Sequence, residues 1–477
     1  MQNQPPNHNI LDTDRIGWLL VKLATPAFFG MFVQVLYNVV NTIFIGQFVG
    51  TLAIAGLSIA FPLQMLVMGL SMMVGMGGAS LVSRLLGSGD KEGAELALGN
   101  GISLSILLGV LAMVAILPFI DFWLKLIGAS EAVLPYAREY LFIIIIGSVF
   151  NILAMALLNF ARAEGNARVG MTAMILGAGL NIILDAVFII WLKMGVKGAA
   201  MGTVIGQIVS MVYLLAYYFS GSSYLKIRAR NLLPDFTILK GMFSVGMASF
   251  VQTVAGSISA MLLINMVVTY GGDIALGAFG IIQRVMMFAI MPGIVIGQGL
   301  QPILGYNYGA RRYHLALKSI KLAAITATSL SLIAFLALYF SPQIFIQVFS
   351  KDPELISIGI YTAKLIFLSM PFMGIIMVGQ LIFQAIGKGM QAFITAIVRP
   401  VAFLIPMVLI LSRFWQLDGV FLSFPASDAL TFLLVVCLIS PVIGQFRKAA
   451  AKQERDGLDT LPSDEMPETA DSGRVTK

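Results

Sequence analysis

The chain has 477 residues, of which 58% are hydrophobic and only 11% are charged. A soluble domain carries about 25% charged residues, so this composition excludes a soluble protein and leaves room for about a dozen membrane spans. The formal net charge of +7 lies in short loops between apolar runs, which argues against a nucleic-acid-binding protein.

Long apolar runs, separated by glycine, proline and charged residues, predict twelve membrane-spanning helices. In chain order they lie near residues 19–45, 52–83, 95–119, 133–160, 169–192, 197–219, 238–269, 274–304, 315–340, 354–385, 391–412 and 419–445. The polar start of the chain lacks the pattern of a cleaved signal peptide, so we expect the first span to direct insertion.

Lysine and arginine are more frequent in alternate loops. The richer set comprises Arg84 and Lys91; Arg162 and Arg168; Lys226, Arg228, Arg230 and Lys240; Arg311, Arg312, Lys318 and Lys321; Lys388; and Arg447, Lys448 and Lys452. By the positive-inside rule these loops face the cytoplasm. Both termini are then cytoplasmic, and we expect a multi-pass protein of a bacterial cytoplasmic (inner) membrane.

The chain repeats itself with a shift of roughly 220 residues. Residues 162–168 (RAEGNAR) match 384–390 (QAIGKGM), and residues 195–199 (GVKGA) match 416–420 (QLDGV). Each repeat holds six predicted helices, and repeats with an even number of helices share one orientation in the membrane. The expected fold is therefore all-α and integral to the membrane, with twelve helices in two pseudo-symmetric six-helix lobes and a substrate path between them.

The repeat also sets the expected domain boundaries. They are a polar cytoplasmic N-terminus (1–15), an N-terminal lobe (16–225), a basic cytoplasmic linker (226–240), a C-terminal lobe (241–447) and a disordered cytoplasmic tail (448–477). Because one chain supplies both lobes, we expect it to function as a monomer.

Few residues suit metal or redox chemistry. The single cysteine, Cys437, lies inside an apolar run, which excludes a disulfide within one chain and argues against a thiolate metal site. The two histidines, His8 and His314, lie far apart in polar segments. We therefore expect no resident metal, no cofactor and no catalytic residues.

Five polar side chains from four predicted spans lie at a similar depth, namely Asp185, Asn181, Thr203, Asn41 and Tyr140. A carboxylate inside a span is costly and marks a functional site by default, so Asp185 is the most informative. It is suited to take up a proton from outside and release it inside. The alternative is a static carboxylate bonded to Asn181, and the other four could simply hold helices together.

Two further groups of polar residues are candidates. Gln34, Tyr37 and Asn38 follow one another along the first span and could contact substrate or serve packing. The intramembrane charges Arg284, Arg399 and Asp428 predict a charged cluster in the second half of the chain. The cluster is either a structural ion pair that neutralises buried charge or a second protonation or substrate site.

Four segments resemble the MATE multidrug efflux antiporters, and most of all their MepA-like bacterial branch. They are residues 34–46 (QVLYNVVNTIFIG), 83–90 (SRLLGSGD), 179–189 (GLNIILDAVFI) and 198–203 (GAAMGT). The likeness extends over residues 15–447 and both repeats. It implies proton- or sodium-coupled export of cationic, lipophilic compounds by rocker-switch alternating access, with the lipid bilayer and such small molecules as the partners.

The resemblance also implies a cation site in the N-terminal lobe, formed by Asn181, Asp185, Thr203 and Asn41. Many relatives have an acid where this chain has Asn41, and the acid of another branch is missing from residues 384–389. The coupling ion is therefore left open between H⁺ and Na⁺, with Na⁺ possible at those four residues.

Two alternative functions receive less support from the sequence. A flippase for lipid-linked saccharides or lipids, on the same superfamily architecture, would favour a strongly basic cavity for pyrophosphate, but the intramembrane basic residues are few. An intramembrane enzyme would need clustered His, Asp, Glu or Ser at catalytic spacing, and the sequence shows no such cluster. A transporter rather than an enzyme is expected.

Overall fold

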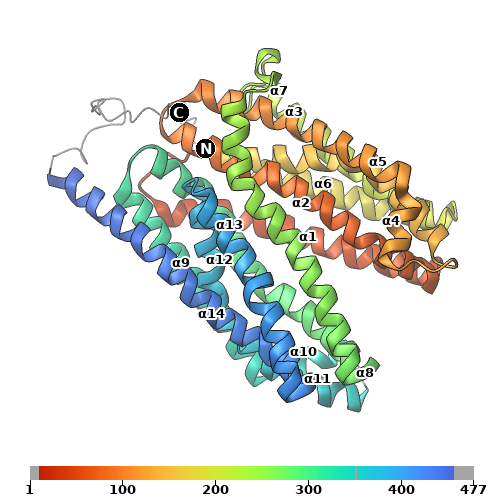
Figure 1. The fold of residues 1–477 in the computed structure, drawn as a ribbon. Coiled ribbons are helices and arrows are strands. Elements are labelled where there is room, and N and C mark those ends of the chain that lie inside the picture. The colour runs from red at the N-terminus through yellow and green to blue at the C-terminus, as the bar shows by residue number, and fades with distance from the viewer. Residues whose placement is uncertain (1–9, 350–351, 456–477) are drawn as a thin grey trace.

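The computed structural model describes residues 10–349 and 352–455, and this part of the chain is almost entirely helical (Figure 1). The first lobe contains α1 (Ile16–Phe48), α2 (Thr51–Gly87), α3 (Lys91–Ile116), η1 (Leu117–Phe119), α4 (Ile120–Ile127), α5 (Leu134–Ala163), α6 (Ala167–Asp185), the π-helical turn η2 (Ala186–Trp191) and α7 (Gly195–Phe219).

A linker with the short helix η3 (Ala229–Leu232) leads to the second lobe. That lobe contains α8 (Phe236–Gly309), α9 (Tyr313–Phe340), α10 (Pro342–Gln347), α11 (Pro353–Phe367), α12 (Met370–Ala385), α13 (Gly389–Ile397), the π-helical segment η4 (Val398–Leu404) and α14 (Ile405–Arg455).

Two continuous helical stretches, α8 and the stretch α13–η4–α14, each contain two spans joined without a gap. A non-helical φ of 65° at Gly272 divides α8, and non-helical angles at Trp415 and Gln416 divide α14. In the described ranges nine helices are long and apolar enough to cross a membrane, or ten with the bent pair α11–α12 counted as one span. Separating the two merged spans at their breaks gives the twelve that the sequence predicted.

Two predicted boundaries differ from the structure. The basic linker was expected to end at residue 240, but α8 already begins at Phe236, where Asp235 accepts hydrogen bonds from the backbone N–H groups of Thr237 and Ile238. The polar tail was expected to begin at residue 448, whereas α14 continues as a helix to Arg455. Residues 456–477, and residues 1–9 with His8, lie outside the described ranges.

The repeat seen in the sequence corresponds to a repeated turn. Gly165 follows α5 with a φ of 93°, and Gly387 follows α12 with a φ of 77°. Glycine adopts this left-handed conformation without steric cost, so it ends a helix and allows the next one to begin two residues later. The matched segments 162–168 and 384–390 thus build the same connection in the two lobes.

The two lobes pack together at one end of the molecule, which we call the closed end. There the hydroxyl of Ser80 on α2 donates to the carbonyl of Gln384, and Gln301 on α8 donates to the carbonyl of Met76 (3.2 Å). Gly87 lies against the backbone of Tyr306 with no room for a side chain. Small residues allow helices to approach this closely inside a membrane.

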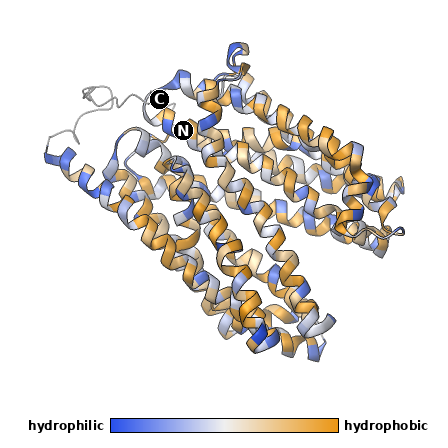
Figure 2. Cartoon of the chain, viewed as in Figure 1, coloured by the Kyte–Doolittle hydropathy of each residue, from blue (hydrophilic) through white to orange (hydrophobic). Residues whose placement is uncertain are grey.

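Away from the closed end the lobes diverge, as Figure 1 shows. The packing agrees with this arrangement, because one large cluster of buried apolar side chains spans both lobes at the closed end. A separate cluster, including Val267, Phe279 and Phe421, forms the core of the diverging half of the second lobe. Hydrophobic residues make up most of the length of the helices, while hydrophilic ones gather near the helix ends (Figure 2). Many large hydrophobic side chains, such as Leu107 and Ile333, are exposed on the surface of the molecule. Such surfaces suit a lipid environment.

Candidate functional site

The most polar cluster inside the first lobe is centred on Asp185, the last residue of α6, whose side chain is 0% exposed. The amide nitrogen of Asn181, one turn earlier, lies 3.5 Å from the Asp185 carboxylate and 3.3 Å from the hydroxyl of Thr203 on α7. In the opposite orientation of this amide group, the nitrogen donates to the other carboxylate oxygen at 3.3 Å. Both orientations direct an amide N–H at Asp185.

The backbone changes its geometry directly after this carboxylate. The α-helical hydrogen bonding of α6 gives way at Ala186 to the π-helical turn η2. Single π-helical turns inside α-helices occur frequently at functional sites. One continuous helix was predicted over 169–192, and the sequence pattern gives no sign of the π-helical turn.

A glycine on the neighbouring helix makes room for the carboxylate. A Cβ atom built on Gly202 of α7 would lie 2.5 Å from the Asp185 Oδ1 atom and 3.4 Å from the Asn181 amide nitrogen. Sequence reasoning had singled out Gly202 only as part of a motif. Its place beside the carboxylate depends on how α6 and α7 pack, which no local pattern specifies.

The carboxylate of Asp185 has little compensation for its charge. Within the described ranges no lysine, arginine or histidine forms an ion pair with it, and the side chain that donates to it is the neutral amide of Asn181. A buried carboxylate without a counter-charge is strongly disfavoured in its ionised form. The site therefore favours an added cation, either a proton or a metal ion held by oxygen ligands.

The other predicted members of the site lie around this centre. Tyr37 on α1 and Tyr140 on α5 are both within electrostatic range of Asp185, and Tyr140 is buried and bonded to Gln64. Asn41, one turn after Tyr37, is buried, and its side-chain oxygen has no hydrogen-bond partner. Gln64 on α2 was missed by the sequence analysis.

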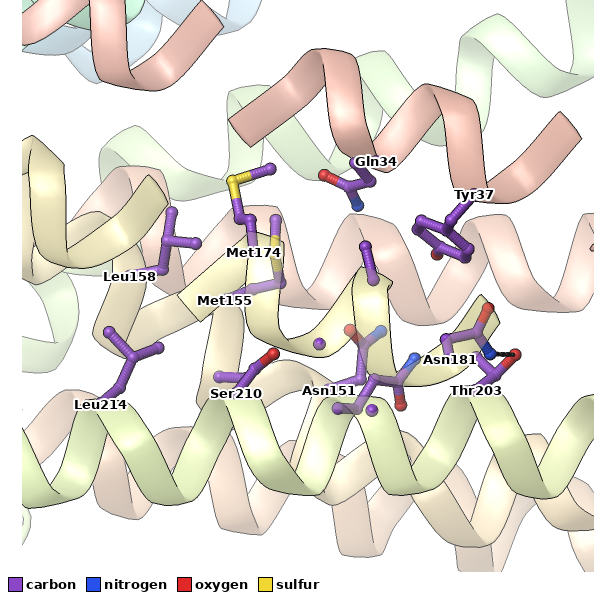
Figure 3. Close-up of a pocket in the computed structure, with 15 residues that line it drawn as sticks. Gln34, Tyr37, Asn151, Met155, Leu158, Met174, Asn181, Thr203, Ser210 and Leu214 are labelled. Atoms are coloured by element: carbon purple, nitrogen blue, oxygen red, sulfur yellow. Dashed lines mark hydrogen bonds between the residues drawn. The ribbon is translucent and has the colours of Figure 1, made fainter. Parts of the chain in front are cut away.

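A cavity of about 90 Å³ opens beside the cluster, between α1, α5, α6 and α7 (Figure 3). Its lining comprises Gln34, Tyr37, Asn151, Ala154, Met155, Leu158, Met174, Gly177, Ala178, Asn181, Thr203, Gly206, Gln207, Ser210 and Leu214. Two of the three predicted substrate contacts on α1, Gln34 and Tyr37, belong to this lining. The third, Asn38, does not; it is exposed and donates to the carbonyl of Gln34 on its own helix (2.8 Å).

Three polar lining residues, Asn151, Gln207 and Ser210, were not predicted. Each is an uncharged polar residue inside a span, and such residues also join helices. Only the packing of α5 against α7 shows that they face this cavity. Met155 and Met174 add flexible, polarizable side chains that adapt to ligands of different shape.

The predicted charged cluster of the second lobe is only a pair. Arg399 in η4 and Asp428 on α14 form two hydrogen bonds of 2.6 and 3.3 Å, and the Asp428 side chain is fully buried. Arg284 is exposed, and in the described chain no hydrogen bond or ion pair joins it to the other two. Of the three predicted charges, the structure therefore pairs Arg399 with Asp428 and does not join Arg284 to them.

Elsewhere in the described ranges, no three His, Cys, Asp or Glu side chains come close enough together to hold a metal ion.

Replacing Gly202 by alanine is expected to displace the Asp185 carboxylate without unfolding the protein, because the colliding atom is the end of a side chain. Transport should fall by at least about tenfold, the effect of a loss of roughly 1.4 kcal/mol at the coupling site. Gly179→Ala is a matched control, since a Cβ there has no heavy atom within 4 Å. Equal transport by both variants would contradict the role of this glycine.

Another buried carboxyl, Glu164, lies outside the spans, immediately after α5 at the closed end. It accepts hydrogen bonds from the hydroxyl groups of Tyr217 (2.5 Å) and Ser223 (2.7 Å) and from the backbone N–H of Leu225. Burial raises the pKa of Glu164 from 4.5 to about 7, although these hydrogen bonds act in the opposite direction. The residue fastens the start of the interlobe linker to the first lobe, and sequence reasoning missed it.

This pKa predicts how stability depends on pH. The folded chain holds the Glu164 proton more tightly than the unfolded chain does. The stabilisation of the fold by this residue is therefore complete below about pH 4.5 and is lost as the pH rises through about 7. The loss amounts to as much as about 3 kcal/mol. The unfolding temperature of the wild type should therefore decrease between pH 5 and 8. Glu164→Gln should reduce this decrease, whereas Glu92→Gln, which changes an exposed carboxyl, should leave it unchanged. Identical pH profiles for all three proteins would contradict this.

Comparisons with known proteins agree with this architecture. The MatE family model matches residues 26–187 and 245–410, one stretch in each lobe. The multidrug export protein MepA of Staphylococcus aureus (strain MSSA476) is 26% identical over 420 residues, covering 88% of this chain and 92% of the relative. The protein of the same name from Staphylococcus haemolyticus (strain JCSC1435) gives the same identity and coverage.

Solved structures show the same fold. One is described as the outward-facing conformation of a multidrug resistance MATE family transporter of the MOP superfamily; it has a TM-score of 0.88 and 25% identity, over 94% of this chain and all of that one. A MOP superfamily transporter from Pyrococcus furiosus has a TM-score of 0.87 and 26% identity over the same shares. The resemblance inferred from the sequence is confirmed: the chain belongs to the MatE family of multi-pass membrane transporters and is not an enzyme.

Proposed function

We propose that the chain is a secondary active antiporter that exports cationic, lipophilic compounds in exchange for H⁺ or Na⁺. The observation that carries this proposal is the uncompensated carboxylate of Asp185 beside a cavity lined by amide, hydroxyl and thioether groups. An ion bound at Asp185 and a drug in the adjoining cavity would share Asn181 and Thr203. Competition for shared groups is a simple physical basis for exchange.

Two coupling ions, a proton and sodium, make different demands on the site. A proton needs only the carboxylate, which would lose its charge when loaded. Sodium needs several oxygen ligands, and the side-chain oxygens of Asp185, Asn181, Thr203 and Asn41 are the candidates. The unpartnered oxygen of buried Asn41 supports sodium. Only one of these four side chains is a carboxylate, which supports a proton.

The two-lobed form supports rocker-switch alternating access. The basic loops lie at the closed end, so the positive-inside rule places that end, and both termini, on the cytoplasmic side of the bacterial inner membrane. The conformation would then be outward-facing, as in the structural relative described by that term. Exchange requires that ion and drug favour different conformations. One chain contains both lobes and would suffice as a monomer.

A flippase for pyrophosphate-linked cargo receives no support from the charges. The sequence predicted two intramembrane arginines for such a cavity, Arg284 and Arg399. Asp428 already neutralises Arg399, so only Arg284 of these two could bind pyrophosphate.

The proposal is tested by reconstituting the full chain in liposomes and following ethidium under imposed gradients. A proton gradient and a sodium gradient are applied separately, at matched membrane potential. We expect one of them to drive ethidium against its concentration gradient. If neither gradient moves ethidium or other lipophilic cations, both cargo and coupling are wrong.

A further inference from the structure

A buried arginine at the closed end has no acidic partner. Arg162 lies in the last turn of α5, and only 9% of its surface is exposed. Its guanidinium donates to the side-chain oxygen of Gln298 on α8 (3.0 Å) and approaches the sulfur of Met174 (3.7 Å). Its Nε–H is buried without any hydrogen-bond partner, and in the described ranges no carboxylate forms an ion pair with it.

This arrangement is energetically unfavourable unless something neutralises the charge. A guanidinium keeps its proton in proteins, so it cannot become neutral as a buried lysine or carboxyl group can. An isolated buried charge costs several kcal/mol even after the protein relaxes around it. One neutral carbonyl oxygen and a thioether sulfur offset only part of that cost.

Arg162 lines a small cavity between the lobes. The lining comprises Ala79, Asn159, Arg162, Ala163, Gln298, Gln301 and Pro302. Each of the three carboxamides carries two N–H donors. Asn159 uses one for the carbonyl of Met155 (2.7 Å) and Gln301 uses one for the carbonyl of Met76 (3.2 Å). The lining thus combines one full positive charge with spare N–H donors and contains no acidic residue.

The size of the cavity restricts its occupant. The cavity has a volume of about 10 Å³, which is enough for one particle about the size of a water molecule. A carboxylate-bearing metabolite, a phosphate group or a lipid headgroup would not fit. A monatomic anion would fit with slight adjustment of the carboxamide side chains.

We propose that this cavity is a binding site for a small monovalent inorganic anion such as chloride. The anion accepts hydrogen bonds from the guanidinium of Arg162 and from the carboxamide N–H groups of Asn159 and Gln298, and it supplies the missing counter-charge. The amide of Gln298 turns its N–H group toward the anion, while the Nη1 group of Arg162 continues to hold the oxygen of that amide.

The site depends on the conformation of the transporter. Ala79, Asn159 and Arg162 belong to the first lobe, whereas Gln298 and Gln301 belong to the second. When the closed end opens, the two sides of the lining separate and the anion loses the ligand from the second lobe, Gln298. A ligand that binds one conformation better stabilises that conformation. The anion therefore favours the form in which the closed end is shut, and Arg162 becomes solvated when it opens.

The test measures thermal unfolding of the purified full chain in nanodiscs, with chloride replaced stepwise by gluconate at constant ionic strength. Gluconate is too large for the cavity, so the unfolding temperature of the wild type should rise saturably with chloride. In Arg162→Gln the response should disappear. In Gln298→Leu, changed in the other lobe, half-saturation should move about tenfold higher, because a hydrogen bond to a charged group is worth about 1.5 kcal/mol.

A matched control is Arg168→Gln, which removes an exposed arginine from the next helix and should leave the chloride response intact. A wild type that responds equally to chloride and gluconate would overturn the proposal, leaving a bound water in the cavity. A response that survives in both Arg162→Gln and Gln298→Leu would also overturn it, as a general salt effect. The assay needs no transport, so its failure would leave the antiporter proposal unaffected.

Discussion

Replacing Asp185 by asparagine is expected to reduce gradient-driven transport strongly while leaving the protein folded. The two side chains have nearly the same shape, but the amide neither binds a proton at physiological pH nor supplies a charged ligand for sodium. Coupling between two ligands is typically worth about 1–3 kcal/mol, so the gradient-driven component should fall about 5- to 150-fold. Ethidium transport by reconstituted protein measures this directly.

Two additional measurements make the result specific. Asp273→Asn removes an exposed carboxylate in the second lobe and should transport like the wild type. Equilibrium binding of ethidium to Asp185→Asn should persist, since most of the cavity lining is unchanged. If Asp185→Asn still concentrates ethidium in response to a gradient, then Asp185 is a structural residue and the coupling site lies elsewhere.

Replacing Gly87 by alanine is expected to hold the two lobes apart at the closed end. A Cβ on Gly87 would overlap the carbonyl oxygen of Tyr306, and Gly309 meets the backbone of Arg84 in the same way. Both obstacles are backbone atoms, so a side-chain rotation cannot relieve the overlap and the lobes must separate. A penalty of about 3 kcal/mol would lower the population of the closed form relative to the open one by more than 100-fold.

The separation of the lobes is measurable by double electron–electron resonance spectroscopy. Spin labels at Ser88 and Lys318 report the distance across the closed end, and both positions are exposed. The single native cysteine, Cys437, is exposed and must first be replaced by serine. Gly256→Ala on α8 is the matched control, because a Cβ there has no heavy atom within 4 Å. An unchanged distance distribution in Gly87→Ala would show that the contact yields locally and does not set the conformation.

The sequence alone determined the features that depend on local pattern. Apolar runs and their breaks predicted twelve spans, and the matched segments 162–168 and 384–390 predicted a repeated connection in the two halves. Asp185 and Asn181 were predicted on one face of one helix, since residues four apart are neighbours in an α-helix. That pair does meet in the structure. The resemblance to the MatE family rested on the same local segments.

Only the tertiary structure decided which helices face one another and at what rotation. It placed Gly202 against Asp185, separated Arg284 from the Arg399–Asp428 pair, and turned Asn38 out of the cavity. It also buried Arg162 between lobes whose contacting residues are more than 130 positions apart in the chain. Periodicity shows that a helix has a polar face but not what packs against it. That choice depends on side-chain shape across distant segments, which is why the environments of buried charges could not be predicted from the sequence.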